Sequence, residues 1–190
     1  VAALRSMTSV PEYVYASGYH TKNDGAFGSH FYRLATDTGQ VDNGGTIIRT
    51  VNGVYELQYD GAVNVKWFGI FPDGTDYSTE IQSAYDTLVS GDVLQFGKGE
   101  YLGYIQCLTN NTTIKGMGSE HTTLKIPNGK IKTTIDEAGT GSISGVPTVI
   151  DLGELNRGNN AVVVNGMKVS GITLDGNKAN QTSYASGCIK

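Results

Sequence analysis

The feature that most constrains the fold is a series of short apolar strands, separated by glycine and asparagine residues, in the second part of the chain. None of these strands can bury a core alone. Stacked rung upon rung, their inward-facing side chains make a continuous interior, as in a solenoid. The sequence therefore predicts stacked short strands, at residues 92–96, 101–104, 112–116, 123–126, 149–152, 161–164 and 168–177.

Residues 63–88 join a predicted strand, a tight turn and an amphipathic helix directly before those strands. We expect a strand at 63–70 and a turn at 71–74, because Pro72 fixes φ and Gly74 tolerates positive φ. Asp76 or Ser78 can cap the helix that follows. Its apolar residues recur at the spacing of one buried helical face, at Ile81, Ala84, Tyr85 and Leu88.

This helix needs a surface to cover. A lone helix of about a dozen residues is marginal in water. Stacked parallel strands leave an open hydrophobic end with unpaired backbone groups, which solenoids close with a terminal element. We therefore predict that the helix caps the first rung of a parallel β-helix, where Ile81, Tyr85 and Leu88 each contribute roughly 1.5 to 3 kcal/mol by burial.

Composition agrees with a fold rich in turns and excludes some partners. Gly accounts for 26 of 190 residues, and charged residues are only 17%. The net charge of −4 gives no electrostatic reason to expect nucleic acid or an anionic membrane as a partner. No apolar run is long enough for a transmembrane helix. Cys107 and Cys188 lie in no metal or redox spacing, so we expect inert thiols.

The texture of the sequence changes near residues 59–61. The first part predicts a small all-β module, with strands at 13–15, 30–34, 46–49 and 54–57, turns at 23–25 and 42–45, and a turn of helix within 3–7. We therefore expect two domains, residues 1–61 and residues 62–190. Residues 130–147 are predicted to loop out of one rung. The chain starts at Val1 and stops inside a predicted strand, which indicates a piece of a longer polypeptide.

Three carboxylates are candidates for catalysis, because hydrolysis of a glycosidic bond needs two carboxyl groups at a fixed separation. Asp151, Glu154 and Asp175 could meet on one stacked face. The alternative is structural: Asp175 belongs to a turn between rungs and Asp151 ends a strand. Asp136 and Glu137 are adjacent, so on a strand they would point to opposite faces, and a solvated loop explains them better.

No residue pattern predicts a metal or a cofactor. Asp73 and Asp76 lie in a turn that leads into a helix, where carboxylates cap backbone amides. His20, His30 and His121 have no carboxylate or second histidine at ligand spacing. Trp67 could stack on a sugar ring, but its position beside Phe68 favours a place in the core.

Several motifs, taken in order, resemble the entrance to the pectate-lyase-like, right-handed β-helix of bacteriophage tailspikes and related polysaccharide-active proteins. They are residues 65–69 (Val-Lys-Trp-Phe-Gly), 73–76 (Asp-Gly-Thr-Asp), 81–84 (Ile-Gln-Ser-Ala), 91–96 (Gly-Asp-Val-Leu-Gln-Phe), 99–101 (Gly-Glu-Tyr), 114–118 (Ile-Lys-Gly-Met-Gly) and 169–177 (Val-Ser-Gly-Ile-Thr-Leu-Asp-Gly-Asn). Residues 18–20, 24–25, 31–32 and 42–48 resemble the small adaptor module that precedes the β-helix in many tail fibres and tailspikes. The chain departs from that module at 26–30, where the family often has a glycine run.

The resemblance implies a homotrimeric receptor-binding spike of the virion. Residues 1–61 would bind a phage tail or adaptor protein, and the β-helix would recognise, and could depolymerise, a bacterial capsule, O-antigen or exopolysaccharide. Catalytic acids in such spikes usually lie on middle rungs or between subunits, so we expect this chain to lack the complete active site. The alternative is a secreted bacterial polysaccharide lyase or glycosidase with an N-terminal binding module.

Overall fold

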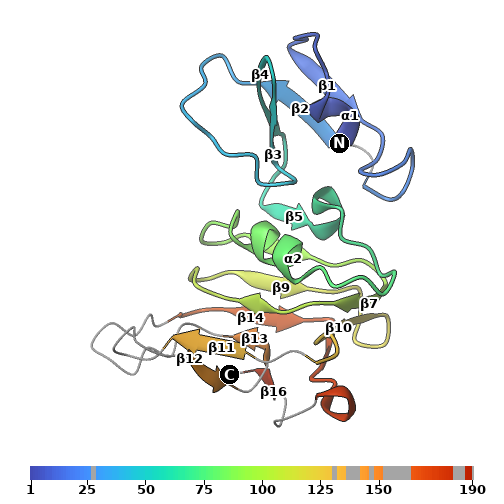
Figure 1. The fold of residues 1–190 in the computed structure, drawn as a ribbon, viewed down its shortest axis with the longest axis vertical. Helices are drawn as coiled ribbons and strands as arrows, with labels where there is room; N and C mark the ends of the chain where they lie inside the picture. The colour runs from blue at the N-terminus through green and yellow to red at the C-terminus, as the bar shows by residue number, and fades with distance from the viewer. Residues whose placement is uncertain are drawn as a thin grey trace.

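The computed structural model describes residues 1–26, 29–129, 132–135, 142–145, 148–151, 164–181 and 187–189. The chain is mainly β and elongated, with a small antiparallel sheet at one end and a stack of parallel strands at the other (Figure 1). The predicted fold class is therefore confirmed. Within these ranges, neither α-helix has the length and hydrophobicity needed to cross a bilayer.

The N-terminal module is a four-stranded antiparallel sheet in the order β1-β2-β4-β3. Its elements are α1 (Ala2–Arg5), β1 (Tyr13–Ala16), β2 (Ser29–Arg33), β3 (Ile47–Thr50) and β4 (Gly53–Leu57). Leu4 of α1 packs with Phe31, Ile48 and Tyr55. Phe31 and Ile48 alternate with more exposed residues along their strands, whereas Tyr55 follows the buried Val54. The short helix and the four strands predicted for this region are all present.

The rest of the chain winds into a parallel β-helix with three faces. The first face holds β5 (Ala62–Asn64), β6 (Val93–Gln95), β9 (Thr113–Lys115) and β14 (Lys168–Ser170). The second holds β7 (Gly99–Leu102), β10 (Thr122–Lys125) and β15 (Thr173–Asp175). The third holds β8 (Ile105–Gln106), β13 (Thr148–Asp151) and β16 (Gly187–Ile189). From β6 onward, apart from the β11–β12 pair, successive strands visit the three faces in turn, which is the expected stacking of rungs.

Register between rungs places apolar residues in line inside the coil. Leu94 pairs with Ile114, Tyr101 with Leu124, and Ile105 with Ile150. These residues are fully buried and belong to one continuous core. The short strands therefore gain their hydrophobic stabilisation from the neighbouring rung rather than from contacts within a strand.

The strand predicted at 63–70 is shorter than expected. It ends at Asn64, and residues 65–68 form a 3₁₀ helix, η1 (Val65–Phe68). The Asn64 side chain accepts a hydrogen bond from the Lys66 N–H at 3.0 Å, and Gly69 ends the helix at φ 75°. Asparagine as an N-cap and glycine in the left-handed region are ordinary helix end signals, and here they override the β-favouring residues between them.

Two further boundaries differ from the predictions. The capping helix α2 (Ser78–Tyr85) ends before Leu88, which is nevertheless buried in the turn that follows. The strand predicted at 101–104 ends at Leu102, and β8 starts at Ile105. The break falls at Gly103, where a Cβ atom would lie 2.5 Å from the Ile81 side chain of the helix. The chain therefore bends where α2 packs against it.

Helix α2 covers the first rung in the predicted way and also satisfies the backbone of that rung. The Tyr77 N–H donates to the Leu102 carbonyl at 2.9 Å, at the end of β7. The Gln82 amide forms a two-way pair with β8: it donates to the Gln106 carbonyl at 3.0 Å and accepts from the Gln106 N–H at 2.8 Å. One side chain thus occupies the place that a neighbouring strand would take.

Residues 130–147 were predicted to loop out of a rung. Their described parts, β11 (Lys132–Ile135) and β12 (Ser142–Gly145), pair as an antiparallel hairpin between β10 and β13. This pairing is what an inserted loop, rather than a rung strand, would form. Asp136, Glu137 and most of the strand predicted at 161–164 lie outside the described residues.

The module joins the β-helix through close ring-to-glycine contacts. A Cβ atom at Gly45 would lie 2.5 Å from the Phe68 ring, and one at Gly69 would lie 2.3 Å from the Tyr19 ring. Trp67 packs against the cores of both parts, and its ring lies 5.8 Å from that of Tyr59. The two glycines therefore allow aromatic rings of one part to lie directly against the backbone of the other.

The pairing of Gln82 with β8 generates a stability prediction. Gln82→Ala leaves both backbone groups of Gln106 without their protein partner, so we expect a loss of about 1 to 3 kcal/mol in the free energy of unfolding. Urea unfolding measures this loss. Ser83→Ala, at a half-buried neighbour whose hydroxyl donates only to the Thr79 carbonyl of the same helix, serves as the control and should change stability by less than about 0.5 kcal/mol. Equal effects of the two variants would contradict a capping role for Gln82.

Two glycines with positive φ offer a matched test of the junction. Gly69 (φ +75°) faces the Tyr19 ring, whereas at Gly74 (φ +87°) a Cβ atom would meet no other atom within 4 Å. Alanine at either position incurs a backbone cost of roughly 1 to 2 kcal/mol. We expect Gly69→Ala to lose about 1 to 3 kcal/mol more in urea unfolding, because the methyl group overlaps the ring. Identical losses would show that Tyr19 moves away freely.

Candidate functional site

The connection between β1 and β2 is organised by one carboxylate. Asp24 accepts backbone N–H groups from Tyr19, His20, Thr21 and Ala26 at 2.7 to 3.1 Å. Burial tends to raise the pKa of Asp24, but these four donors prevail and hold it below its usual value. The ionised side chain therefore shapes this loop.

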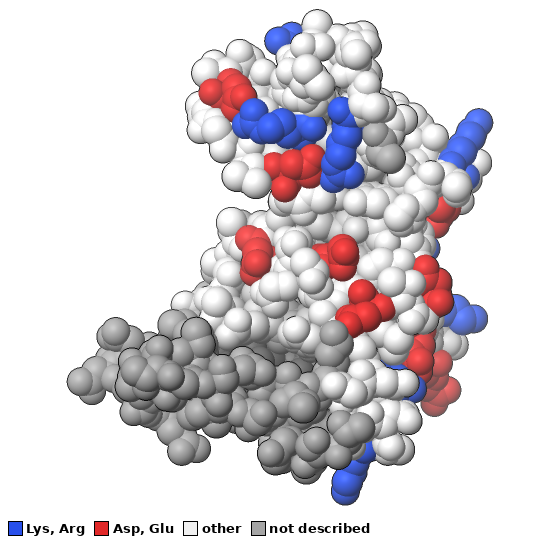
Figure 2. Space-filling view, in the orientation of Figure 1, with Lys and Arg blue, Asp and Glu red and all other residues white. Residues whose placement is uncertain are grey.

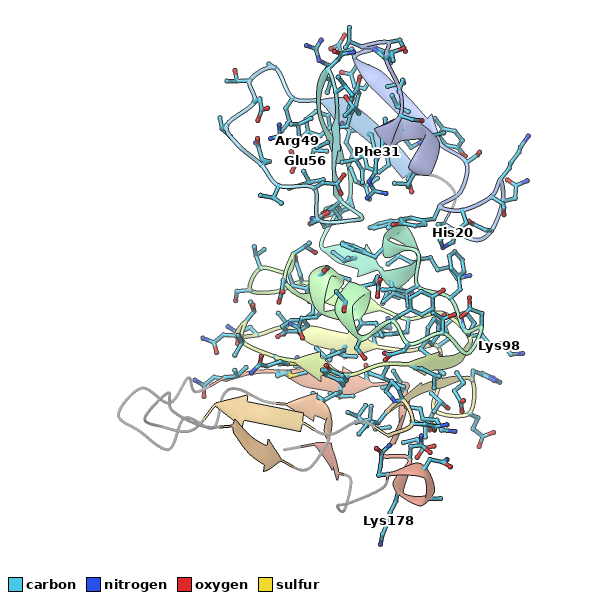
Figure 3. All side chains as sticks on the ribbon, in the orientation of Figure 1. His20, Phe31, Arg49, Glu56, Lys98 and Lys178 are labelled. Carbon is cyan, nitrogen blue, oxygen red and sulfur yellow. The ribbon has the colours of Figure 1, made fainter. Side chains whose placement is uncertain are left out.

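The loop shaped by Asp24 bridges the two parts of the molecule. The Tyr19 hydroxyl donates to the Gly44 carbonyl at 3.0 Å, while its ring lies against Gly69 of the β-helix. The neighbouring His20 lies at the lower edge of the module (Figure 3), with its ring 5.5 Å from that of Phe71. The module is thus fixed to the β-helix by a ring network instead of a single flexible linker.

A second carboxylate, Asp42, fixes the opposite side of the module. It forms an ion pair with Arg5 of α1 at 2.9 Å and accepts the backbone N–H groups of Gly44 and Arg49. Burial acts to raise the pKa of Asp42, but the Arg5 guanidinium and the two N–H donors together lower it. The loop before β3 is therefore tied both to α1 and to the edge of the sheet.

A polar cleft of about 430 Å³ separates the module from the capping helix. Figure 2 shows it as the hollow between the module and the β-helix. Glu56, labelled in Figure 3, lines it from the module, and Asp86 lines it from the turn after α2. Its other lining residues are Asn43, Thr46, Ile47, Tyr59, Ser83 and Thr87. No basic side chain is among them, so the cleft favours neutral or cationic groups.

The structure does not bring the three predicted acids into one described constellation. Asp175 ends β15 on the second face of the β-helix, whereas Asp151 ends β13 on the third face, and its side chain is not described. Glu154 lies outside the described residues. Asp175 accepts the Asn177 N–H at 2.7 Å, and its other oxygen lies 3.7 Å from the Lys125 ammonium. Asp175 therefore stabilises the turn after β15, which leads from the second face toward the third, whereas the structural alternative expects a turn between rungs.

The two aspartates before α2 have structural partners. Asp73 accepts the Thr75 N–H at 2.9 Å and the Tyr77 hydroxyl at 3.0 Å, and Asp76 accepts the Ser78 N–H at the start of α2. Among the described residues, no group of three histidine, cysteine or acidic side chains is arranged to hold a metal ion. The turn and capping roles predicted for these two aspartates match their hydrogen bonds.

Cys107 is a buried free thiol beneath the capping helix. Burial raises its pKa to about 12, so the thiolate that reacts with electrophiles is scarce at neutral pH. The side chain of Cys188 is not described. The inert thiol predicted for Cys107 is thus consistent with its surroundings.

Sequence reasoning missed the residues that make the junction. Tyr19, Gly45 and Gly69 lie in turns whose local signals say nothing about a partner far along the chain. The available signal was weaker. Trp67 and Phe68 are adjacent and follow the module directly, and together they carry more aromatic surface than the three-residue strand β5 can bury. Gln82 gave no signal, because a glutamine on a helix is ordinarily a solvated residue.

Comparison with known proteins gives a family for the first part of the chain. Residues 1–60 match the family model described as the phage tail protein small four-stranded beta-sheet domain. The antiparallel sheet of the module has four strands, as this family description states. A comparison with curated proteins found no match.

Solved structures with a similar fold are phage tailspikes. The tailspike gp49 of Acinetobacter baumannii bacteriophage Fri1, a capsular polysaccharide depolymerase, matches with TM-score 0.64 and 19% identity, over 98% of this chain and 34% of its own. The enzymatically active domain of bacteriophage CBA120 tailspike protein 2 gives TM-score 0.59 and 22% identity, over 100% and 25%. The tailspike of Acinetobacter baumannii phage AM24 gives 0.52 and 19%, over 90% and 32%.

The present chain therefore spans a quarter to a third of the length of these tailspikes. At identities of 19 to 22%, the structural similarity establishes only the fold. The family match of residues 1–60 adds the link to phage tails. The order of parts is the one that the sequence motifs indicate, with the module first and the capped β-helix second. Residues 1–60 therefore match a small four-stranded phage tail domain, and the chain as a whole has the fold of phage tailspikes.

Proposed function

We propose that this chain is the tail-attachment and folding-entry section of a phage receptor-binding spike. The observation that carries the proposal is the position of the module: it sits on the capped end of the β-helix, and the rungs stack away from it (Figure 1). A spike must hold the virion at one end and present its sugar-binding surface at a distance. This arrangement places the two tasks at different positions along the long axis of the molecule.

The module is the part proposed to bind the virion. Its match to a phage tail domain supports this role over that of a sugar-binding module on a secreted bacterial lyase. Its attachment to the β-helix through Tyr19, Gly45 and Gly69 supports it as well, because a rigid joint transmits the orientation of the tail to the β-helix. We place the protein on the phage tail, acting at the bacterial surface.

The β-helix is proposed to recognise and depolymerise a bacterial surface polysaccharide, whether capsule, O-antigen or exopolysaccharide. Support comes from its fold, shared with a tailspike that is a capsular polysaccharide depolymerase. We also propose a homotrimer, since a module of about sixty residues buries little of its own surface and gains stability from intersubunit contacts. Asp151 and Glu154 stay candidates for catalysis, while the bonds of Asp175 suit it to a structural role.

Attachment is tested with virions that lack the spike, to which purified full-length spike is added back. Deleting residues 1–61 should abolish rebinding, measured by sedimentation of labelled spike with the virions, because the proposed contact surface is gone. Retained depolymerase activity of the deletion variant shows that its β-helix still folds. Undiminished rebinding by an active deletion variant would overturn the proposed role of the module.

The candidate acids are tested by conservative substitution in the full-length spike. We expect Asp175→Asn to change the rate of release of reducing or unsaturated sugar ends by less than about twofold, because its carboxylate serves a turn and an ion pair. Asp151→Asn and Glu154→Gln should also retain activity if catalysis resides on later rungs. A loss of about 10² to 10⁴ for any of the three would place an acid–base residue in this section.

A further inference from the structure

The two edge strands of the module differ in how their backbone groups are satisfied. At the β3 edge, the Ile47 N–H donates to the Asn43 side chain at 2.9 Å, and the Arg49 N–H donates to the Asp42 side chain at 3.1 Å. The Asn43 N–H also donates to the Ile47 carbonyl at 3.1 Å. The loop before β3 therefore closes this edge against any further strand.

The β1 edge has no such cover. The Arg33 N–H donates to the Glu12 carbonyl at 2.7 Å, so Glu12 and Arg33 are a hydrogen-bonded pair of the antiparallel ladder. Every second residue of β1 after Glu12 therefore bonds to β2. Val14 and Ala16 then bond to β2, while the N–H and C=O groups of Tyr13 and Tyr15 point away from the sheet. Among the described residues, no group bonds to these outward positions.

The open edge is held firmly in an extended conformation. The buried Tyr55 donates its hydroxyl to the Pro11 carbonyl at 2.9 Å, directly before β1. Ala16 at the other end packs into the core of the module. β1 carries no charged residue and no proline, so it lacks two of the devices that proteins use to block edge pairing. An incoming strand would meet a rigid template that needs little ordering.

The side chains beside this edge suit an uncharged peptide. Tyr13 and Tyr15 are 64% and 57% exposed, and the Tyr15 ring packs against that of His30 at 5.1 Å. On the other side of the strand, a groove of about 310 Å³ runs between α1 and β1, where its apolar lining includes Leu4, Met7, Val14 and Ala16. Its charged lining groups are the Val1 ammonium, which donates to the Gly18 and Tyr19 carbonyls, and Lys22, and both lie with the loop that follows β1. A strand paired to β1 would place alternate side chains on the rings and in the groove.

We propose that the open edge of β1 binds an extended, uncharged segment of a phage tail protein by β-strand addition. The inference rests on the proposed function of the module and names the contact that performs it. A second copy of this chain is a poor occupant. Pairing β1 with β1 closes a dimer and cannot build a three-fold assembly, and pairing β1 with β3 of a neighbour is blocked by Asp42 and Asn43.

The test compares Tyr15→Pro with Tyr15→Ala in the full-length spike, added back to spike-deficient virions. Both variants remove the ring, but only proline removes the outward N–H, and neither affects the bonds that Val14 makes to β2. We expect Tyr15→Pro to bind at least tenfold more weakly than Tyr15→Ala. Tyr104→Pro, at an exposed tyrosine in the bend before β8, controls for the effect of proline elsewhere.

Amide hydrogen exchange on the unmodified spike gives a second readout that needs no variant. The amides of Tyr13 and Tyr15 should exchange quickly in the free spike and become protected on the virion, while that of Val14 is protected in both. Equal binding of the two Tyr15 variants together with unprotected edge amides would overturn the inference, even if deleting residues 1–61 abolishes binding. If these amides are already protected in the free spike, and the protection changes with spike concentration, the edge instead binds a second copy of the chain.

Discussion

The structure depends on closing the first rung of a parallel coil. Each of the three faces begins with a strand whose outer backbone groups would otherwise have no partner. The second face is closed by Tyr77 and the third by the amide of Gln82, while the first face ends in β5, which pairs with β6 and leads into η1. Helix α2 adds the apolar cover through Ile81, Tyr85 and neighbouring residues. One short segment thus satisfies both the hydrophobic and the hydrogen-bonding requirements of the open end.

Closing this end also creates the platform on which the module sits. The 3₁₀ helix after β5 places the Phe68 ring against Gly45 and packs Trp67 on the core of the module, and the Tyr19 ring of the module lies against Gly69 directly after that helix. The two carboxylates Asp24 and Asp42 hold the loops that carry these contacts. Local electrostatics in the module therefore set the geometry of the joint, and the joint fixes the module relative to the β-helix.

Much of this architecture could be predicted from the sequence, because short strands and one amphipathic helix leave few ways to bury a core. The periodicity at Ile81, Ala84 and Tyr85 identified the cap, and glycine with asparagine marked the turns. The sequence did not reveal that Gln82 replaces a strand or that Gly69 receives Tyr19, since both depend on residues far apart in the chain. Of the candidate acids, Asp175 illustrates the same limit: its contacts with Lys125 and Asn177 could not be predicted from the sequence.

Electron cryo-microscopy of the intact tail would show which end of the spike meets the virion. We expect the four-stranded module of residues 1–60 to contact the tail and the rungs from β6 to β16 to project away from it. A map in which the module points into solvent and the β-helix contacts the tail would refute the proposed role of the module.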